Sequence, residues 1–259
     1  MKKKNKKNPM DDQKEIVVSS KKFRNKSIVA FIVFFIAIAA GVFAWKWLQR
    51  QPQVAGVQKP LRKGLSLDEK VFSKALSDKH LAKTYPVSAA AKNVRFNGDV
   101  GLRSPLDSNW KLKVVRSPGD TLFISLDDIK ALPKTDITFD FKCIEGWSQI
   151  SNWSGVKFSD FAKKYNLGLQ TQMNYVGLTT PDNKYYVGID MASMMHPQTL
   201  LCYEMNGKPL PLNQGYPLRL IIPVKYGIKS LKRIGTIFFS STPPPDYWYE
   251  RGYDYYSGL

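Results

Sequence analysis

The strongest constraint on this chain is an uninterrupted apolar segment near its N-terminus. Residues 27–45 contain no charged residue. As a helix that rises about 1.5 Å per residue, a segment of this length spans roughly the 30 Å hydrocarbon core of a bilayer. A helix buried in a soluble protein shows a polar face, and this segment has none. Trp45 and Trp47 follow at the end, where amphipathic rings prefer the membrane interface. The sequence therefore predicts one transmembrane anchor over residues 27–48.

The charges on either side of this segment predict its orientation. Residues 1–26 hold ten lysines and arginines against three acids, a composition typical of a solvated, disordered tail. Fewer basic residues follow the apolar segment, so the positive-inside rule places the tail in the cytoplasm and the rest of the chain outside. The alternative is a cleaved signal peptide, with Val54-Ala55-Gly56 as a loose cleavage site.

The composition excludes several kinds of site. The 259 residues include two cysteines, Cys143 and Cys202, and two histidines, His80 and His196. These are too few for a disulfide-dense scaffold, a four-cysteine zinc site or a three-histidine metal centre. The formal net charge of +18 suits either an anionic partner or an ordinary solvated basic surface. We expect no nucleic-acid partner.

Hydrophobic periodicity predicts a strand-rich α+β domain after a linker. Residues 49–63 are polar and contain two prolines, so we expect an extended, mobile linker, followed by short helical pieces over 65–83. From residue 110 onward, alternating patterns predict strands at 110–115, 121–126, 136–143, 174–179, 185–189, 218–223 and 234–240, with a helical turn at 125–129 and a helix at 157–165. We therefore expect four parts: a basic tail (1–26), the anchor (27–48), a linker and lead-in segment (49–80), and one α+β domain with a mixed sheet (81–259).

One cysteine lies in an unusual setting. Cys143 ends an alternating strand and precedes a polar, aromatic loop, which places its sulfur at the edge of a sheet. A thiolate there suits a soft, electron-rich metal centre. The alternatives are an inert buried thiol, a disulfide with Cys202, or a protease-like pair with His196.

The residues around this cysteine resemble a known family. Cys143-Ile-Glu-Gly-Trp147, followed by Asn152-Trp-Ser-Gly155, is similar to the cysteine loop of the sulfite oxidase-like molybdopterin enzymes. The segments 194–211, 215–234 and 243–254 resemble most closely the catalytic subunits of bacterial periplasmic protein-methionine-sulfoxide reductases. The resemblance covers roughly residues 85–256 and implies the strand-rich fold of the molybdopterin-binding domain.

The resemblance also implies a cofactor, molybdenum-molybdopterin, and the residues that hold it. Cys143 matches the catalytic cysteine whose sulfur ligates the metal. An arginine fork, a lysine and a hydroxyl suit the phosphate of the pterin. The implied cofactor-binding residues are Thr180, Gln214, Arg219, Ser230, Lys232 and, less securely aligned, Asn97.

One residue departs from the family pattern, and the roles of several others are open. Gln214 stands where the family usually has asparagine, which moves the amide by one methylene group. The alternative for Lys225, Lys229 and Lys232 is that they decorate a solvated strand end. Tyr85 and Arg95 are further candidates near the cofactor. Glu145, Trp147 and the aromatic residues at 247–249 are candidates to line the pocket, with packing of the domain as their simpler role.

The implied activity is two-electron oxygen-atom transfer, with sulfoxide reduction favoured. Sulfite oxidation with the same cofactor is one alternative, and an anchored, metal-free binding or assembly protein of the same fold is another. No haem domain is encoded in these residues, so we expect a separate electron-transfer partner, such as a haem- or quinone-linked membrane protein. The expected location is the inner membrane with the catalytic domain facing the periplasm. The absence of a twin arginine before the apolar segment, where Ser20-Lys21-Lys22-Phe23 stands, argues against that placement.

Overall fold

The structure, a computed structural model, describes residues 19–75 and 80–259. The chain divides into two compact units, Met1–Gln51 and Pro52–Leu259. Most of the predicted basic tail lies outside the described residues. The first unit is α1 (Ser20–Gln49), which begins within that tail, so that its last lysines and arginine continue the helix.

No residue of α1 is buried against other parts of the protein. Its apolar side chains are exposed, among them Phe31 at 64% and Phe35 at 63%. Within the described residues, α1 is the one helix whose length and composition suit a membrane crossing. The predicted anchor therefore lies inside a longer helix.

The second unit starts with folded structure where an extended linker was predicted. A two-stranded hairpin, β1 (Gln53–Val54) and β2 (Val57–Gln58), leads directly into α2 (Lys59–Ala75). Gly56 has a φ of +81° and its Cα lies so close to the backbone of Arg251 that a Cβ would meet the carbonyl carbon at 2.8 Å. The hairpin thus packs on the C-terminal part of the domain, and the prediction of a mobile linker up to residue 63 is wrong.

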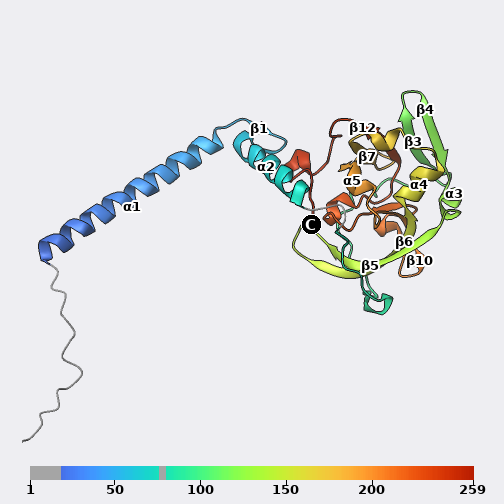
Figure 1. Cartoon of the computed structure of the whole chain (residues 1–259), viewed down its shortest axis with the longest axis horizontal. Helices are drawn as coiled ribbons and strands as arrows, with labels where there is room; N and C mark the ends of the chain where they lie inside the picture. The colour runs from blue at the N-terminus through green and yellow to red at the C-terminus, as the bar shows by residue number, and fades with distance from the viewer. Residues whose placement is uncertain (1–18, 76–79) are drawn as a thin grey trace, which may run out of the picture. The chain divides into compact units, whose positions relative to one another are not determined.

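The rest of the domain is an α+β fold built on two five-stranded sheets (Figure 1). Short 3-10 turns connect several of its elements. In chain order the helices and strands are β3 (Leu112–Ser117), β4 (Asp120–Ile124), α3 (Leu126–Lys130), β5 (Lys134–Lys142), β6 (Ser148–Lys157), α4 (Phe158–Lys164), β7 (Tyr175–Thr179), β8 (Tyr186–Asp190), α5 (Met191–Met194), β9 (Leu200–Met205), β10 (Lys208–Pro209), β11 (Arg219–Ile221) and β12 (Thr236–Ser240).

The two sheets have different connectivity. The first has the order β10-β9-β6-β5, with β11 also paired to β9, and its pairings are antiparallel. The second has the order β4-β3-β12-β7-β8, in which β12 runs parallel to β3. The sheet mixture and the strand-rich α+β class agree with the prediction, as do α4 and the capped turn at α3, where Ser125 and Asp128 form a capping box.

The larger core contains apolar residues from both sheets and from α4. Strand β9 contributes to two cores, because Leu201 and Tyr203 belong to the larger cluster while Leu200 and Cys202 belong to a smaller one. Successive side chains of a strand point to opposite faces. The first sheet is therefore covered on both faces, and the smaller cluster lies on the face that also carries the candidate site.

Candidate functional site

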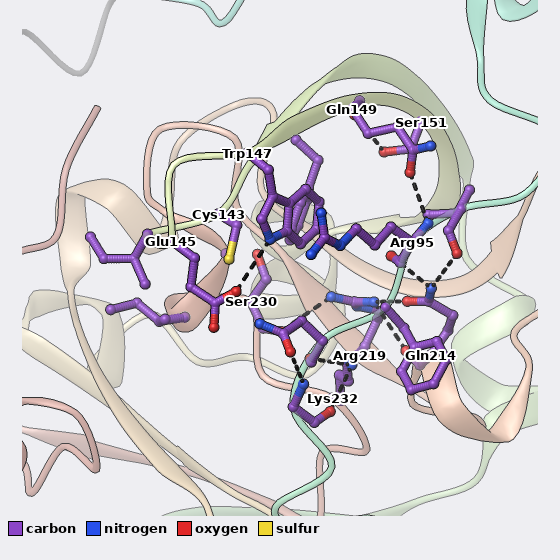
Figure 2. Close-up of a pocket in the computed structure, with 18 of the residues that line it drawn as sticks. Arg95, Cys143, Glu145, Trp147, Gln149, Ser151, Gln214, Arg219, Ser230 and Lys232 are labelled. Carbon is purple, nitrogen blue, oxygen red and sulfur yellow. Dashed lines mark hydrogen bonds between the residues drawn. The ribbon is translucent and has the colours of Figure 1, made fainter.

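A cavity opens on the face of the first sheet that holds the smaller apolar cluster. It receives residues from the ends of β5 and β11, from β6, from residues 94–100 and from the segment after β11. Figure 2 shows its polar side chains directed toward a common space. Of the residues implied by the resemblance, those lining the cavity are Asn97, Cys143, Gln214, Arg219, Ser230 and Lys232.

Cys143 lies in the tight loop that joins β5 to β6. Its backbone N–H donates to the carbonyl of Trp147 at 2.9 Å, and its carbonyl accepts from the N–H of Gly146 at 3.1 Å. Gly146 has a φ of +88°. It is the residue in the left-handed conformation that a three-residue hairpin loop with a bulge requires. The two longest strands of the sheet therefore fix the position of the sulfur, and the side chain is 8% exposed.

Strand β6 forms the wall beside this cysteine. Gln149, Ser151 and Trp153 line the cavity, and their spacing of two residues places them on one face of the strand. The indole N–H of Trp153 donates to the Ser151 hydroxyl at 2.8 Å. This strand was missed by the sequence analysis, which interpreted its first half as a loop.

Arg219 is the most unusual charged group in the site. It is 2% exposed, and its guanidinium carbon lies 4.6 Å from the centre of the Trp153 ring. The guanidinium donates to the Gln214 side-chain oxygen at 2.8 Å and to the Gln214 carbonyl at 3.1 Å. It forms no ion pair within the part of the chain that the structure describes, and its Nε has no hydrogen-bond partner there. The cavity thus contains a buried cation without a countercharge.

A second cation and a hydroxyl lie beside this arginine. Lys232 donates from Nζ to the carbonyls of Asn97 and Gly98 at 2.8 and 3.0 Å. Ser230 is 4% exposed, and its hydroxyl has no hydrogen-bond partner among the described residues. Because buried polar groups in proteins are nearly always hydrogen-bonded, the unpaired hydroxyl indicates that the cavity is shaped for a ligand.

Burial disfavours the charged form of both cations. Burial, followed by the neighbouring charge of Arg219, lowers the pKa of Lys232 to about 7. Burial also lowers the pKa of Arg219 to about 10. Each shift records the cost of holding positive charge in this cavity without an anion. An anion bound between the two side chains would remove that cost.

Gln214 connects the arginine to the strand-like segment before Asn97. Its side-chain nitrogen lies 3.4 and 3.3 Å from the carbonyl oxygens of Val94 and Arg95. Since its oxygen accepts from Arg219, both ends of the amide are engaged with the protein. Gln214 therefore braces Arg219, and Asn97 enters the site mainly through its backbone carbonyl.

Thr180 stands apart from the other implied residues. It does not line the cavity, and its hydroxyl donates to Asp182 at 2.7 Å and accepts from the N–H of Tyr185 at 3.1 Å. The buried His196 and Cys202 also lie outside the cavity, and both cysteines are free. Neither a disulfide nor a pairing of Cys143 with His196 is present.

Two of the lysines that could have decorated a solvated strand end lie elsewhere. Lys225 and Lys229 are buried, and their ammonium groups lie 2.7 Å from an Asp190 oxygen and 2.5 Å from an Asp246 oxygen. They anchor the segment that precedes Ser230. The alternation of the sequence gives no signal for these pairs, because their partners are distant in the chain.

The lining of the cavity extends beyond the six implied residues that it contains. Arg95 stacks on Trp147, with its guanidinium carbon 4.6 Å from the ring centre. Apolar and aromatic residues complete the wall, and the sequence signalled only part of this set through its C-terminal aromatic run. These further lining residues include Phe96, Val100, Ile144, Tyr185, Ile228, Trp248 and Tyr253.

The donor set fits a molybdopterin carrying molybdenum. No group of three or more His, Cys, Asp or Glu side chains within the described residues is arranged to hold a metal ion. One thiol cannot hold a metal by itself, so a metal beside Cys143 needs ligands that it brings along, as the dithiolene of a pterin does. The unpaired cation and hydroxyl suit the phosphate of such a group.

Comparison with known proteins decides the family. Residues 97–248 match the family described as "Oxidoreductase molybdopterin binding domain". The chain belongs to this family. It is a sulfite oxidase-like, molybdopterin-dependent oxidoreductase, and the match includes each of the implied site residues.

Individual relatives agree. The chain is 36% identical over 181 residues to the "Putative protein-methionine-sulfoxide reductase subunit YedZ1" of Azospira oryzae, an alignment covering 69% of this chain and 68% of that protein. It is 34% identical over 161 residues to the "Protein-methionine-sulfoxide reductase catalytic subunit MsrP" of Xanthomonas campestris, covering 55% of this chain and 48% of that protein. The aligned part of the chain thus spans 68% of the first relative and about half of the second.

A solved structure is also similar. The sulfane dehydrogenase SoxCD from Paracoccus pantotrophus matches 54% of this chain and 40% of its own, with 17% identity and a TM-score of 0.47.

Proposed function

We propose that this chain is a membrane-anchored oxidoreductase that reduces sulfoxides by oxygen-atom transfer. The observation that carries the proposal is the buried, uncompensated Arg219 in a cavity that Cys143 also lines. A cation kept out of water without a carboxylate costs free energy. An anionic cofactor that occupies the same cavity for most of the lifetime of the protein would offset this cost.

The cations and the hydroxyl hold the phosphate of the pterin. Arg219 presents a planar fork, Lys232 a point charge and Ser230 a hydroxyl that can donate. Asn97 lies beside them, and Gln214 holds the arginine in place from behind. Thr180, which is buried beside Tyr185, supports the wall of the cavity from outside. Hydrogen bonds to a charged partner contribute about 1.5–3 kcal/mol each, so this group of residues accounts for tight retention.

Cys143 provides the protein's ligand to the metal. The bound cofactor supplies two-electron oxygen-atom transfer. The tight loop between β5 and β6 holds the sulfur at a fixed place, so that it would offer a bound metal a well-positioned ligand. Trp147 and Trp153 shield this side of the cavity from water.

Reduction of a sulfoxide consumes two electrons and two protons and releases a sulfide and water. Glu145 is the one carboxyl group that lines the cavity within the described residues, and its Oε2 lies 3.4 Å from the indole nitrogen of Trp147. It is exposed and can exchange protons with solvent. We assign the delivery of protons to this carboxyl group.

The shape of the cavity favours a sulfoxide over sulfite. Apolar and aromatic side chains line most of it, including Phe96, Val100 and Tyr253, which are 52%, 36% and 37% exposed. A thioether with an apolar body suits such a wall. Sulfite is a small dianion that needs several cations at the reacting centre, and it remains the alternative substrate.

Membrane anchoring rests on α1. Its apolar residues need an apolar phase, and the basic residues before it favour a cytoplasmic N-terminus. The catalytic domain then faces the periplasm from the inner membrane. Electrons come from a separate partner, for which a haem- or quinone-linked membrane protein is the expected class.

The test is metal analysis followed by two assays. We expect the full chain, purified in detergent from a host that makes the cofactor, to contain about one molybdenum per chain, as one thiol ligand per chain implies. The loaded protein is then assayed with methionine sulfoxide and a reduced viologen dye, and separately with sulfite and an oxidant. Faster sulfite turnover would reverse the proposed direction, and repeated absence of molybdenum would support the metal-free binding protein instead.

A further inference from the structure

Helix α2 carries an exposed apolar stripe. Leu61, Leu67 and Val71 are 46%, 62% and 56% exposed. At 100° per residue, Leu67 and Val71 are neighbours on one face and Leu61 lies at its border. Soluble helices normally bury such a stripe. Here the opposite face, not this one, packs against the domain.

Arg62 fixes that opposite face. It is 5% exposed, and its guanidinium donates to the carbonyls of Ala55 at 2.6 Å, Tyr249 at 3.0 Å and Tyr253 at 2.8 Å. It also stacks on the Tyr249 ring, with 4.2 Å between its guanidinium carbon and the ring centre. The orientation of α2 relative to the catalytic domain is therefore set, and the apolar stripe is turned away from it.

Basic side chains border the stripe. Lys63 and Lys70 lie along one edge, and Lys59 is at the start of the helix; all three are exposed. An apolar stripe with lysines beside it is the pattern of a helix that lies in the interface of a bilayer with anionic lipids. Asp68 comes on the other side of the stripe, so it is the lysine edge that complements anionic headgroups.

Only a short length of chain separates the end of α1 from α2. The N–H of Lys59 donates to the carbonyl of Pro52 at 2.9 Å, and Pro52 follows the last residue of α1, Gln49, by three positions. Three residues of chain reach at most about 10 Å. If α1 crosses a membrane, this short length of chain keeps the beginning of α2 close to the surface of that membrane.

We propose that α2 lies on the membrane surface, with Leu61, Leu67 and Val71 inserted among the lipids and its lysines on anionic headgroups. This inference rests on the proposed membrane anchoring. Because Arg62 joins α2 to the segment 249–253, and Tyr253 lines the cavity, the helix sets which wall of the active site lies next to the bilayer. An electron donor in the same membrane would meet the domain on that side.

The test measures lipid contact in the full chain. A fluorescent probe is attached to Leu67→Cys or Val71→Cys, and the protein is reconstituted in vesicles of phosphatidylcholine and phosphatidylglycerol. Leu169→Cys, at a residue that is 75% exposed in the catalytic domain, is the matched control. The native Cys143 and Cys202 are buried. Labelling of the unsubstituted chain measures how much probe they take up.

We expect lipid-borne nitroxides to quench probes at 67 and 71 several-fold more than the probe at 169, while an aqueous quencher shows the reverse order. Quenching by the aqueous reagent alone would overturn the inference. Protection from both quenchers would also overturn it, because a protein partner or a second copy would then cover the stripe.

Two further variants separate this inference from the anchoring itself. A probe at Phe43→Cys, within α1, reports whether that helix is in the bilayer. Lipid quenching at 43 without quenching at 67 would overturn only the role of α2, whereas absence at both positions would overturn the anchoring. Replacing Lys59, Lys63 and Lys70 by glutamine should remove the preference of the probe at 67 for vesicles with phosphatidylglycerol, and an unchanged preference would contradict the assigned headgroup contact.

Discussion

Lys229 and Asp246 form an ion pair that is almost completely removed from water. Their side chains are each 2% exposed, and 2.5 Å separates Nζ from Oδ2. The ammonium also donates to the carbonyl of Gly188, in β8, at 3.0 Å. Since Ser230 is the next residue, this pair fixes the loop that presents the unpaired hydroxyl to the cavity.

Breaking this pair should destabilise the protein strongly. Lys229→Met leaves the buried Asp246 carboxylate without its countercharge, although the backbone N–H groups of residues 188, 248 and 249 still donate to it. We expect a loss of about 3 kcal/mol in the free energy of unfolding. Molybdenum content should fall with it. Lys134→Met is the control, because the side chains of the Lys134–Glu204 pair are 45% and 23% exposed and a pair this accessible to water should contribute less than about 1 kcal/mol. Urea denaturation measures both, and equal losses would contradict the assigned role.

Replacing Cys143 by serine should leave the domain folded but remove activity. The substitution changes the metal ligand with little change in volume. Cys202→Ser is the matched control: its sulfur is fully buried and donates to the Glu204 carbonyl, a bond that a hydroxyl can keep. We expect molybdenum content and sulfoxide turnover to survive in the control only. Wild-type turnover in Cys143→Ser would show that the sulfur is not a ligand.

Arg219→Met should separate cofactor binding from stability. Loss of one charge-assisted hydrogen bond of about 1.5–3 kcal/mol weakens retention of the cofactor roughly 10- to 100-fold. The cofactor-free chain should lose little stability, because an uncompensated buried cation disappears at the same time. Arg116→Met removes the same charge at a distance from the cavity and should retain the cofactor. If Arg219→Met were much less stable but bound the cofactor with unchanged affinity, the role of this arginine would be purely structural.

Gln214→Asn tests the brace behind Arg219. The shorter amide cannot reach both Arg219 and the carbonyls at 94–95, so one hydrogen bond is lost, at a cost of about 0.5–1.5 kcal/mol. We expect a lower melting temperature and a slightly faster loss of cofactor during dialysis. An unchanged or higher melting temperature would mean that the backbone shifts to restore the contact.

The carboxyl group of Asp190 should make the stability of the fold depend on pH in the acidic range. Burial opposes its ionisation, but the Lys225 ammonium outweighs this effect and lowers the pKa of the carboxyl group below 3.8. A carboxyl group with a lowered folded-state pKa stabilises the fold above its unfolded pKa, and the contribution disappears as the pH falls through the lower folded value. Thermal unfolding from neutral pH down through 3.8 should therefore show a smaller decline in Asp190→Asn than in the unsubstituted chain. Parallel declines would argue against the assignment.

Part of the fold could be predicted because its strands alternate. Strands such as β3 and β5 have one face on a core, so their apolar residues recur at every second position. Two central strands were not predicted. Strand β9 is buried on both faces and reads as a continuous apolar run, while β6 carries buried polar residues, Ser151, Asn152 and Ser154, which resemble a loop in sequence.

The site could be predicted only through resemblance. Asn97, Cys143 and Arg219 come from distant parts of the chain, and no spacing rule links them. The unpaired state of the Ser230 hydroxyl and the buried partner of Lys229 depend on three-dimensional contacts. Thr180, implied by the resemblance, lies behind the cavity wall, which shows that a matched position need not face the ligand directly.

The hydrogen bonds of Arg62 have a practical meaning for anyone who wishes to separate the domain from α1. Trimming within α1, or just before Pro52, keeps the hairpin and the arginine together. Trimming beyond residue 62 removes the donor that the carbonyls of Tyr249 and Tyr253 share and loosens the aromatic residues beside the cavity. Where a protease cuts will therefore decide whether the shed enzyme stays intact.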